Sequence, residues 1–344
     1  MNQTPRPQQA EFVELNQLPQ LKHTLTLTHT LLILCAVGIW GTNFVIMKNT
    51  VLVLPPLLLA AMRFFFTLIP AIFFVPRPNV RWTNLMGYGL SIGVVQFGCL
   101  YVAVNGQITP GLASLVVQTQ VIFTIGMSVY LNSERLRIYQ LFALVLAVIG
   151  LMIIGFHADT QTTLGGLALT ILAALGWATG NLFSKRAVGV NMISYIVWST
   201  VFSVPALLGL SLYVEGAQSI GLHLDELSLQ TWFAVLWQAW ANTIFGYGIW
   251  GWLLARYTAA TVTPFALLVP VFGMGASSIF LDESLPAWKL GAAGLVIAAM
   301  LLNTFGARLV SVIEDIREKA KAKVKIKTTA KLKTKNSITQ SNQQ

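Results

Sequence analysis

The sequence predicts an all-α polytopic membrane protein with ten transmembrane helices, arranged as two inverted five-helix repeats. Three observations lead to this fold class. The chain is 55% hydrophobic and 10% charged, with a mean hydropathy of +0.69, whereas an ordinary soluble domain is about 25% charged. Apolar stretches of about 20 residues, enough to cross a bilayer, recur along the chain. Basic residues gather in alternate connections. This pattern argues against a soluble enzyme or a DNA-binding module.

Polar or proline-bearing breaks separate the apolar stretches. At 1.5 Å per residue, a helix of about 20 residues crosses about 30 Å of hydrocarbon. Backbone groups in lipid must satisfy their own hydrogen bonds, so each stretch is expected to be helical. The ten expected spans are Thr28–Met47, Leu57–Val75, Leu85–Val104, Leu112–Leu131, Ile138–Phe156, Leu164–Phe183, Met192–Val214, Thr231–Leu254, Thr263–Leu281 and Ala287–Phe305.

The connections alternate in charge. Nineteen of the 22 basic residues precede the first span or follow an even-numbered one, and ten of these lie between Arg308 and Lys335. Apart from Lys48, at the end of the first span, the segments after odd-numbered spans hold no base, and their charged residues are acids such as Asp159, Glu215 and Asp282. Basic loops stay in the cytoplasm, so both termini are expected there.

Two sets of residues repeat between the halves of the chain. Phe123, Gly126, Glu134, Leu136 and Leu141 match Phe272, Gly275, Glu283, Leu285 and Leu290, and Trp40, Thr42 and Lys48 match Trp177, Thr179 and Lys185. Both alignments pair span one with span six and span four with span nine. An odd number of spans per unit inverts the second unit, and such repeats place a site near the bilayer midplane. A duplication without transport is the alternative reading.

The repeat divides the chain into four parts. They are a polar extension at 1–27, repeats at 28–156 and 164–306, and a lysine-rich tail at 307–344. The tail is expected to be disordered near anionic inner-leaflet lipids. Because its bases follow the last span, we expect a membrane partner and no nucleic acid.

Arg63 is the first candidate site residue, since a charge within a span is costly and often functional. Its guanidinium either holds the carboxylate of a substrate or pairs with a carbonyl group on a neighbouring helix. No Asp or Glu lies within any expected span, which weakens a buried proton relay. Glu134 and Glu283 are instead expected to cap the helices that follow them.

Uncharged polar and aromatic residues are better suited to line a cavity. Amides and hydroxyls inside a span must face protein or water. Gln118 and Gln120 point about 200° apart on one helix, so only one can face the centre, and Gln118 is preferred. Each of these side chains has interhelical hydrogen bonding or packing as its alternative role. The remaining candidates for substrate binding or gating are Trp40, Asn43, Gln96, Trp177, Asn181, Trp240 and Asn242.

No cofactor or metal is expected, because the sequence contains no CxxC, HExxH or Walker-type glycine loop. Cys35 and Cys99 lie in apolar stretches and are expected to be free thiols. Gly89/Gly93 and Gly176/Gly180 are small-xxx-small pairs, which indicate close helix contacts.

Six motifs carry a resemblance to a known family. They are WGTNFVIMK at 40–48, PPLLLAAMRFFF at 55–66, PGLASLVVQTQVIFTI at 110–125, GWATGNLFSK at 176–185, YGIWGWLLARY at 247–257 and PFALLVPVFGMGASSIFLDE at 264–283. Together they resemble the EamA branch of the drug/metabolite transporter superfamily, over about Thr30 to Gly306. The resemblance is greatest to bacterial inner-membrane exporters of O-acetylserine and cysteine.

The resemblance implies a central cavity between two inverted repeats, alternating access, and export of small metabolites of the cysteine pathway from the inner membrane. Export of another amino acid or of a drug is the alternative within the family, and a membrane-embedded transferase is a distant one. Oligomeric state, coupling ion and direction stay open.

Overall fold

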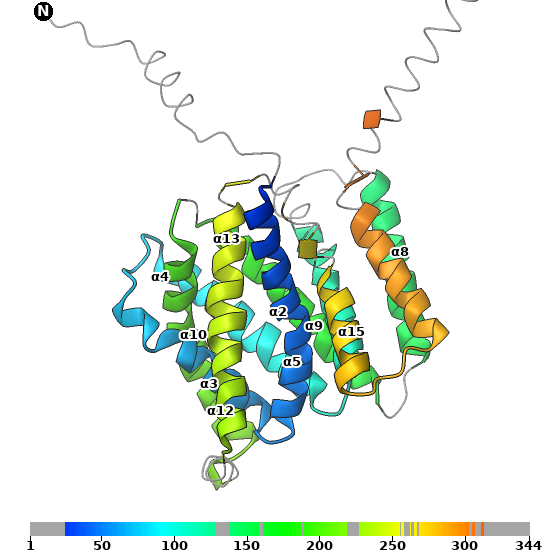
Figure 1. Cartoon of the computed structure of the whole chain (residues 1–344). Helices are drawn as coiled ribbons and strands as arrows, with labels where there is room; N and C mark the ends of the chain where they lie inside the picture. Colours follow the sequence, from blue (N-terminus) through cyan, green and yellow to red (C-terminus); the bar gives the residue numbers. More distant parts are fainter. Residues whose placement is uncertain are drawn as a thin grey trace, which may run out of the picture.

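The computed structural model describes residues 25–120, 122–124, 126–127, 138–157, 161–187, 189–218, 227–254, 256–257, 262, 265–266, 268–302, 305–306 and 311–312. Over these residues the fold is a bundle of helices with no strand (Figure 1). The all-α membrane fold class is therefore confirmed. The polar extension before residue 25, Glu134, and the tail after residue 312 lie outside the described residues.

The helices follow the apolar stretches in order. Their bounds are α2 Leu27–Val51, α3 Pro56–Leu68, α4 Trp82–Gly89, α5 Cys99–Val104, α6 Pro110–Val116, α8 Ile138–Phe156, α9 Leu164–Lys185, α10 Met192–Val214, α12 Leu229–Trp237, α13 Gly248–Leu254 and α15 Leu268–Phe280. Short segments η1 (Ala71–Phe73), η2 (Leu90–Gly98), η3 (Val117–Thr119) and η4 (Gln238–Tyr247) continue or join them. A further helix covers Ala287–Leu302.

Most expected bounds agree with the structure, and α8 and α10 agree at both ends. The second span differs: α3 ends at Leu68 instead of continuing to Val75, because Pro70 lacks an amide hydrogen and disfavours helical backbone at the residue before it. Five helical stretches in the described part of the chain are long and apolar enough to cross a membrane. Four shorter apolar helices accompany them. The total of ten spans stays a prediction.

Both chain ends of the described bundle lie on one side. The start of α2 and the end of the helix Ala287–Leu302 lie at the same end of the molecule in Figure 1. An even number of crossings produces this arrangement. Which end faces the cytoplasm stays a prediction from the basic loops.

Helices from the first half of the chain pack against helices from the second half. In the predicted repeat, α3 corresponds to α10 and α6 to α15, and each of these pairs is in direct contact. Likewise, α2 packs on η4 and α15, while its counterpart α9 packs on η2 and α6. Two units related by a two-fold axis make such reciprocal contacts. The first and second halves are therefore interleaved rather than separate.

Two spans contain a π-helical segment at corresponding places. In the third span, η2 joins α4 to α5, and in the eighth span η4 joins α12 to α13. A π-helical turn contains one more residue than an α-turn, and it often occurs at functional sites. Both segments lie near the middle of their spans, and both contribute amide side chains to the site described below.

The two glycine pairs lie where helices approach most closely. A Cβ atom on Gly89 would lie 2.2 Å from the carbonyl oxygen of Ser199 on α10, and one on Gly176 would lie 2.8 Å from the backbone nitrogen of Gln96. Only glycine allows these approaches. The expectation that the pairs mediate close helix contact is confirmed.

We predict that Gly89→Ala destabilises the protein, since a backbone atom cannot move aside as a side chain can. The expected cost is about 1–3 kcal/mol, the usual range for an overpacked contact. Gly209→Ala is the matched control, because a Cβ atom there meets nothing within 4 Å. Thermal unfolding of the two purified variants checks this. Equal unfolding temperatures would contradict the close packing of α4 against α10.

Candidate functional site

A pocket lies at the centre of the bundle. Its cavity volume is about 40 Å³, room for a few water molecules at about 10–15 Å³ each. Most of its residues lie well inside their helices, away from the helix ends. The pocket is lined by Trp40, Asn43, Phe44, Met47, Gln96, Phe97, Leu100, Val117, Gln118, Trp177, Asn242, Tyr247 and Val269.

Three amide side chains in this pocket have buried atoms with no hydrogen-bond partner among the described residues. These are Oδ1 of Asn43, Oε1 of Gln96, and both Oε1 and Nε2 of Gln118. The three residues are 5%, 3% and 0% exposed. A buried polar atom without a partner costs about 1–3 kcal/mol. These amides are therefore arranged for a partner that the protein itself does not supply.

Arg63 lies beside the pocket, behind its wall. Its Nη2 donates to Oδ1 of Asn242 (2.6 Å), its Nε to Oγ1 of Thr243 (3.0 Å) and its Nη1 to the hydroxyl of Tyr101 (3.2 Å). The side chain is completely buried. Among the described residues, no carboxylate pairs with it. The partners of Arg63 are an amide and two hydroxyls. All three are uncharged, so none of them neutralises the positive charge of the guanidinium.

The same guanidinium lies under an aromatic ring that lines the pocket. Its Cζ atom is 3.8 Å from the ring centroid of Phe97, a distance at which cation–π attraction is strong. Arg63 thus holds two lining residues, Phe97 and Asn242, without lining the pocket itself. The structure places Arg63 in a pairing network, and its partners are side chains rather than a backbone carbonyl.

Aromatic residues form half of the remaining wall. Trp40 donates from Nε1 to the backbone oxygen of Asn242 (3.1 Å) and packs against Tyr247 at a centroid distance of 5.1 Å. Trp177, the counterpart of Trp40 in the predicted repeat, lines the same pocket. The two tryptophans therefore come from equivalent helices, α2 and α9, and meet at one site.

Besides Arg63, two candidates from the sequence do not line the pocket. Asn181 donates from Nδ2 to Oε1 of Gln120 (3.1 Å), away from the centre. Trp240 is 46% exposed and donates from Nε1 to the carbonyl oxygen of Phe66 (3.0 Å) on the outside of the bundle. Its position has a simple reason: residues two apart on a helix point about 200° apart. Because Asn242 faces inward, Trp240 faces outward.

Sequence reasoning missed several lining residues, Phe97 and Tyr247 among them. Tyr247 follows Asn242 by five residues, which brings both to one face only if the helix is π-helical. No sequence signal reveals a π-helical turn. Glu215 is identifiable from the sequence only as an acid in an outer loop, and its structural role was also missed.

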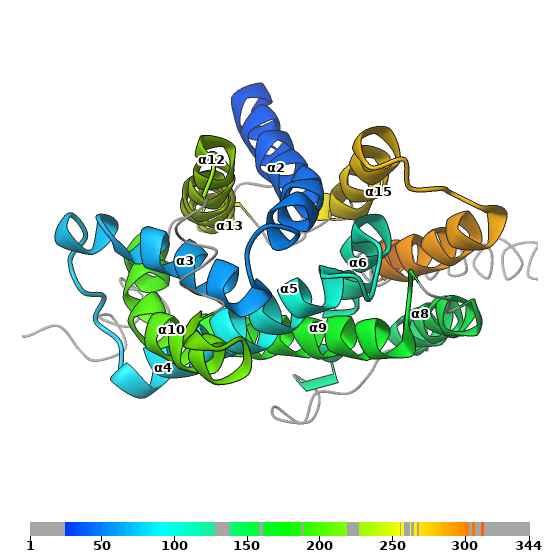
Figure 2. The same ribbon diagram turned by 90° about the horizontal axis from the view of Figure 1, so that it is seen from below.

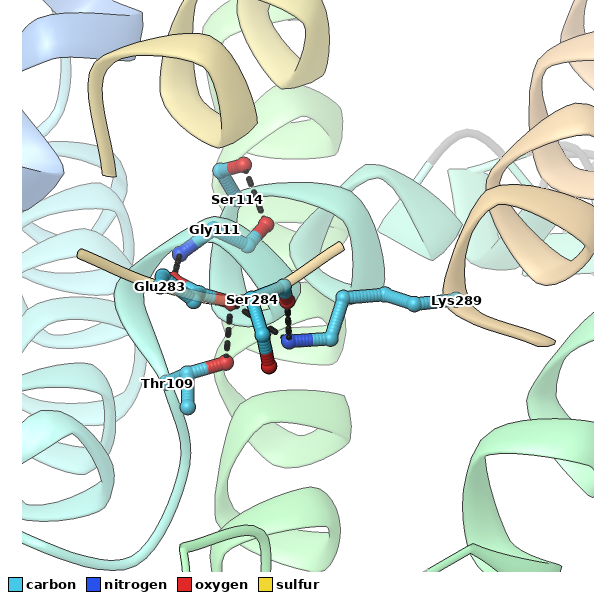
Figure 3. A network of polar contacts seen from close by, with 6 residues as sticks. All are labelled: Thr109, Gly111, Ser114, Glu283, Ser284 and Lys289. Atoms are coloured by element: carbon cyan, nitrogen blue, oxygen red, sulfur yellow. Dashed lines mark hydrogen bonds and ion pairs between the residues drawn. The ribbon is translucent and has the colours of Figure 1, made fainter. Parts of the chain in front are cut away.

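Glu283 was expected to cap the helix that follows it, and this prediction is wrong. Its carboxylate binds the start of α6 instead, accepting from the backbone nitrogen of Gly111 (2.9 Å) and from Oγ1 of Thr109 (2.6 Å) (Figure 3). The following helix begins only at Ala287, four residues after Glu283, and the carboxylate is taken up by the start of α6 instead of the free amides of that helix. Lys289 completes the site with an ion pair of 2.9 Å.

A second acid from the second half of the chain caps the start of another helix. Glu215 accepts from the backbone nitrogens of Leu57 (2.6 Å) and Leu58 (3.0 Å) at the first turn of α3. Both α3 and α6 begin with proline at the first helical position. Carboxylates at helix N-termini satisfy free amides and complement the helix dipole. The two halves are thus joined at one end of the bundle by two caps.

Comparison with known proteins adds the family. The model of the EamA-like transporter family matches residues 27–156 and again residues 164–305. The chain belongs to the EamA-like transporter family. This membership agrees with the resemblance of the six sequence motifs, and it makes the chain a multi-pass membrane transporter.

Two similar EamA relatives come from enteric bacteria. A probable amino-acid metabolite efflux pump of Salmonella typhimurium is 40% identical over 81% of this chain and 95% of its own length. A probable amino-acid metabolite efflux pump of Escherichia coli is 37% identical over 80% and 95%. A crystal structure with 16% identity has a TM-score of 0.58 and covers 82% of this chain and 98% of its own. That structure shows the fold alone.

The pocket amides give a testable prediction. We expect Gln118→Leu to reduce transport about tenfold while leaving stability equal or higher, because neither amide atom of Gln118 has a partner to lose. Gln120→Leu is the matched control, since Gln120 bonds to Asn181 outside the pocket and its loss leaves transport near wild type. Initial transport rates and unfolding temperatures of both variants check this. Equal transport by the two variants would remove Gln118 from the site.

Proposed function

We propose that the protein exports amino acids of the cysteine pathway, such as O-acetylserine and cysteine, across the bacterial inner membrane. The observation that carries the proposal is the central pocket with three unpartnered amides from three helices. A small polar metabolite offers donors and acceptors for such amides. The two relatives named probable amino-acid metabolite efflux pumps support this substrate class and the outward direction.

In this proposal the two repeats rock about the central pocket and expose it to each side in turn. Both termini lie in the cytoplasm, and the lysine-rich tail lies near anionic lipids of the inner leaflet. A polar hollow of about 440 Å³, lined by Lys48, Asp282 and Glu283 among others, lies at the C-terminal end of α2. This hollow is the exit on the outer side.

Export of a cationic drug is the alternative within the family. No acidic side chain lines the central pocket among the described residues, and the buried charge of Arg63 repels cations. Other neutral amino acids match the same set of amide side chains, so export of one of them is the stronger alternative to export of cysteine and O-acetylserine.

The test is accumulation of O-acetylserine and cysteine in the medium of cells that express the protein. An empty vector and the Gln118→Leu variant at matched membrane abundance are the controls. Accumulation that depends on the wild-type protein is the expected result. If neither compound accumulates, the cysteine-pathway assignment is wrong, and other amino acids become the next candidates.

A further inference from the structure

We propose that the pocket binds its substrate as an oriented zwitterion, with the carboxylate at Asn242 and the ammonium group toward Gln118, and that Arg63 sets this polarity. The inference rests on the proposed function and adds the chemical groups that the site recognises. Asn242 and Gln118 are the specificity-determining residues, and Arg63 is a positioning residue that never touches the substrate.

The orientation of the Asn242 amide is the first step. The guanidinium of Arg63 can only donate hydrogen bonds, so the atom of Asn242 that lies 2.6 Å from Nη2 must be the oxygen. The amide nitrogen then points the other way. Because Asn242 lines the pocket, this end of the site presents an N–H donor, polarised by the buried cation behind it. A donor of this kind fits a carboxylate.

The charge balance of the site is the second step. No charged side chain lines the pocket among the described residues, and the fixed charge beside it is the fully buried Arg63. Its guanidinium lies beneath the Phe97 ring at 3.8 Å, on the same side as Asn242. Fixed charge in a low-dielectric interior acts strongly over short distances. The Asn242 end of the pocket is therefore electropositive.

The opposite end can offer an acceptor. Neither amide atom of Gln118, Oε1 or Nε2, has a hydrogen-bond partner among the described residues, so the side chain can turn Oε1 toward an ammonium group, and Trp177 also lines the pocket. An amide oxygen and the face of an indole both attract an ammonium group. Since α9 packs on η3, Trp177 and Gln118 come from neighbouring segments.

The two ends belong to different walls. The helices α12 and α13, which η4 joins, lie on one side of α2, and α6, which η3 continues, lies on the other (Figure 2). Asn242 on η4 and Gln118 on η3 thus reach the pocket from different segments. In an α-amino acid the ammonium and carboxylate groups are bonded to one carbon atom, so the two groups can meet these side chains only where the walls lie close together, as in a cavity of about 40 Å³.

The test uses isosteric amide-to-acid variants at the two ends. Asn242→Asp replaces the donor by a carboxylate that keeps the Arg63 contact and the fold. Gln118→Glu places a carboxylate at the other end. Inside-out membrane vesicles with the full-length protein take up labelled cysteine, and competition is measured with cysteine, cysteine methyl ester (no carboxylate) and N-acetylcysteine (no ammonium group).

In wild-type vesicles, cysteine methyl ester and N-acetylcysteine are each expected to compete at least about tenfold more weakly than cysteine. Each has lost one charged hydrogen-bonding group, and one such bond accounts for an effect of this size. Asn242→Asp is expected to remove the discrimination against the methyl ester. The ratio of the inhibition constants of the ester and of cysteine then shifts by about tenfold or more. Gln118→Glu is expected to leave that ratio unchanged and to weaken competition by N-acetylcysteine by about tenfold.

Four outcomes count against the proposal. The same selectivity shift in both variants shows that the pocket has no polarity. A shift toward the ester in Gln118→Glu alone reverses the orientation. No uptake of cysteine by wild-type vesicles contradicts the proposed function and the inference with it, whereas uptake with unaltered selectivity in both variants contradicts the inference alone.

Discussion

Replacing Arg63 by methionine is expected to abolish transport and to lower stability by about 2–5 kcal/mol, the range for breaking a buried network that involves a charge. Methionine fills much of the volume of the arginine stem, so the effect comes from the lost guanidinium. Oδ1 of Asn242 loses its donor, and Phe97 loses the cation beneath its ring. Efflux from cells and thermal unfolding of the purified protein measure the two effects.

A double variant separates stability from function. In Arg63→Met with Asn242→Leu, both partners of the hydrogen bond are removed, and we expect most of the lost stability to return while transport stays absent. Arg81→Met is the matched control, because Arg81 is exposed and its loss changes neither quantity by much. Full transport by Arg63→Met would show that the buried charge has no role in the site.

Removal of the Glu283 carboxylate is expected to have the second large effect, a loss of stability. Glu283→Ala is expected to destabilise the protein by about 3–5 kcal/mol, because it leaves a buried cation without its counter-ion. Lys289 is 5% exposed, and its remaining hydrogen-bond partner among the described residues is the carbonyl oxygen of Ser284 at 3.0 Å. The amide of Gly111 and the hydroxyl of Thr109 also lose their acceptor. Chemical or thermal unfolding of the purified variant measures the loss.

The variant Glu283→Ala with Lys289→Met tests the cause. Removing the cation as well is expected to recover at least half of the lost stability, since no unpaired charge remains buried. If the double variant is as unstable as the sum of the single variants, the ion pair contributes nothing. The capping of α6 alone would then explain the effect.

The fold could be predicted from the sequence because a bilayer leaves few choices. Long apolar stretches must be helical, and their bounds follow from the first polar or proline residue on each side. This reasoning located α8 and α10 at both ends. It placed the end of α3 too late, because it weighed the hydropathy of residues 69–75 above the proline at position 70.

The site was predictable only in part. Polar side chains in the middle of a span must face protein or water, and this rule brought Asn43, Gln96, Gln118 and Asn242 to one pocket. The rule does not say which polar residue meets another side chain, so Asn181 was also included. Partners across the chain, such as Glu215 with the start of α3, depend on tertiary packing that a single sequence does not reveal.

The two caps also bear on the order in which the chain assembles. Leu57 and Glu215 are 158 residues apart, and Gly111 and Glu283 are 172 apart. At about 5–20 residues per second, synthesis of such a stretch takes about 8–34 s. During that time the inserted first half has two helix starts without their acidic partners. The first half is therefore a poor autonomous folding unit, and its completion depends on the synthesis of Glu215 and Glu283.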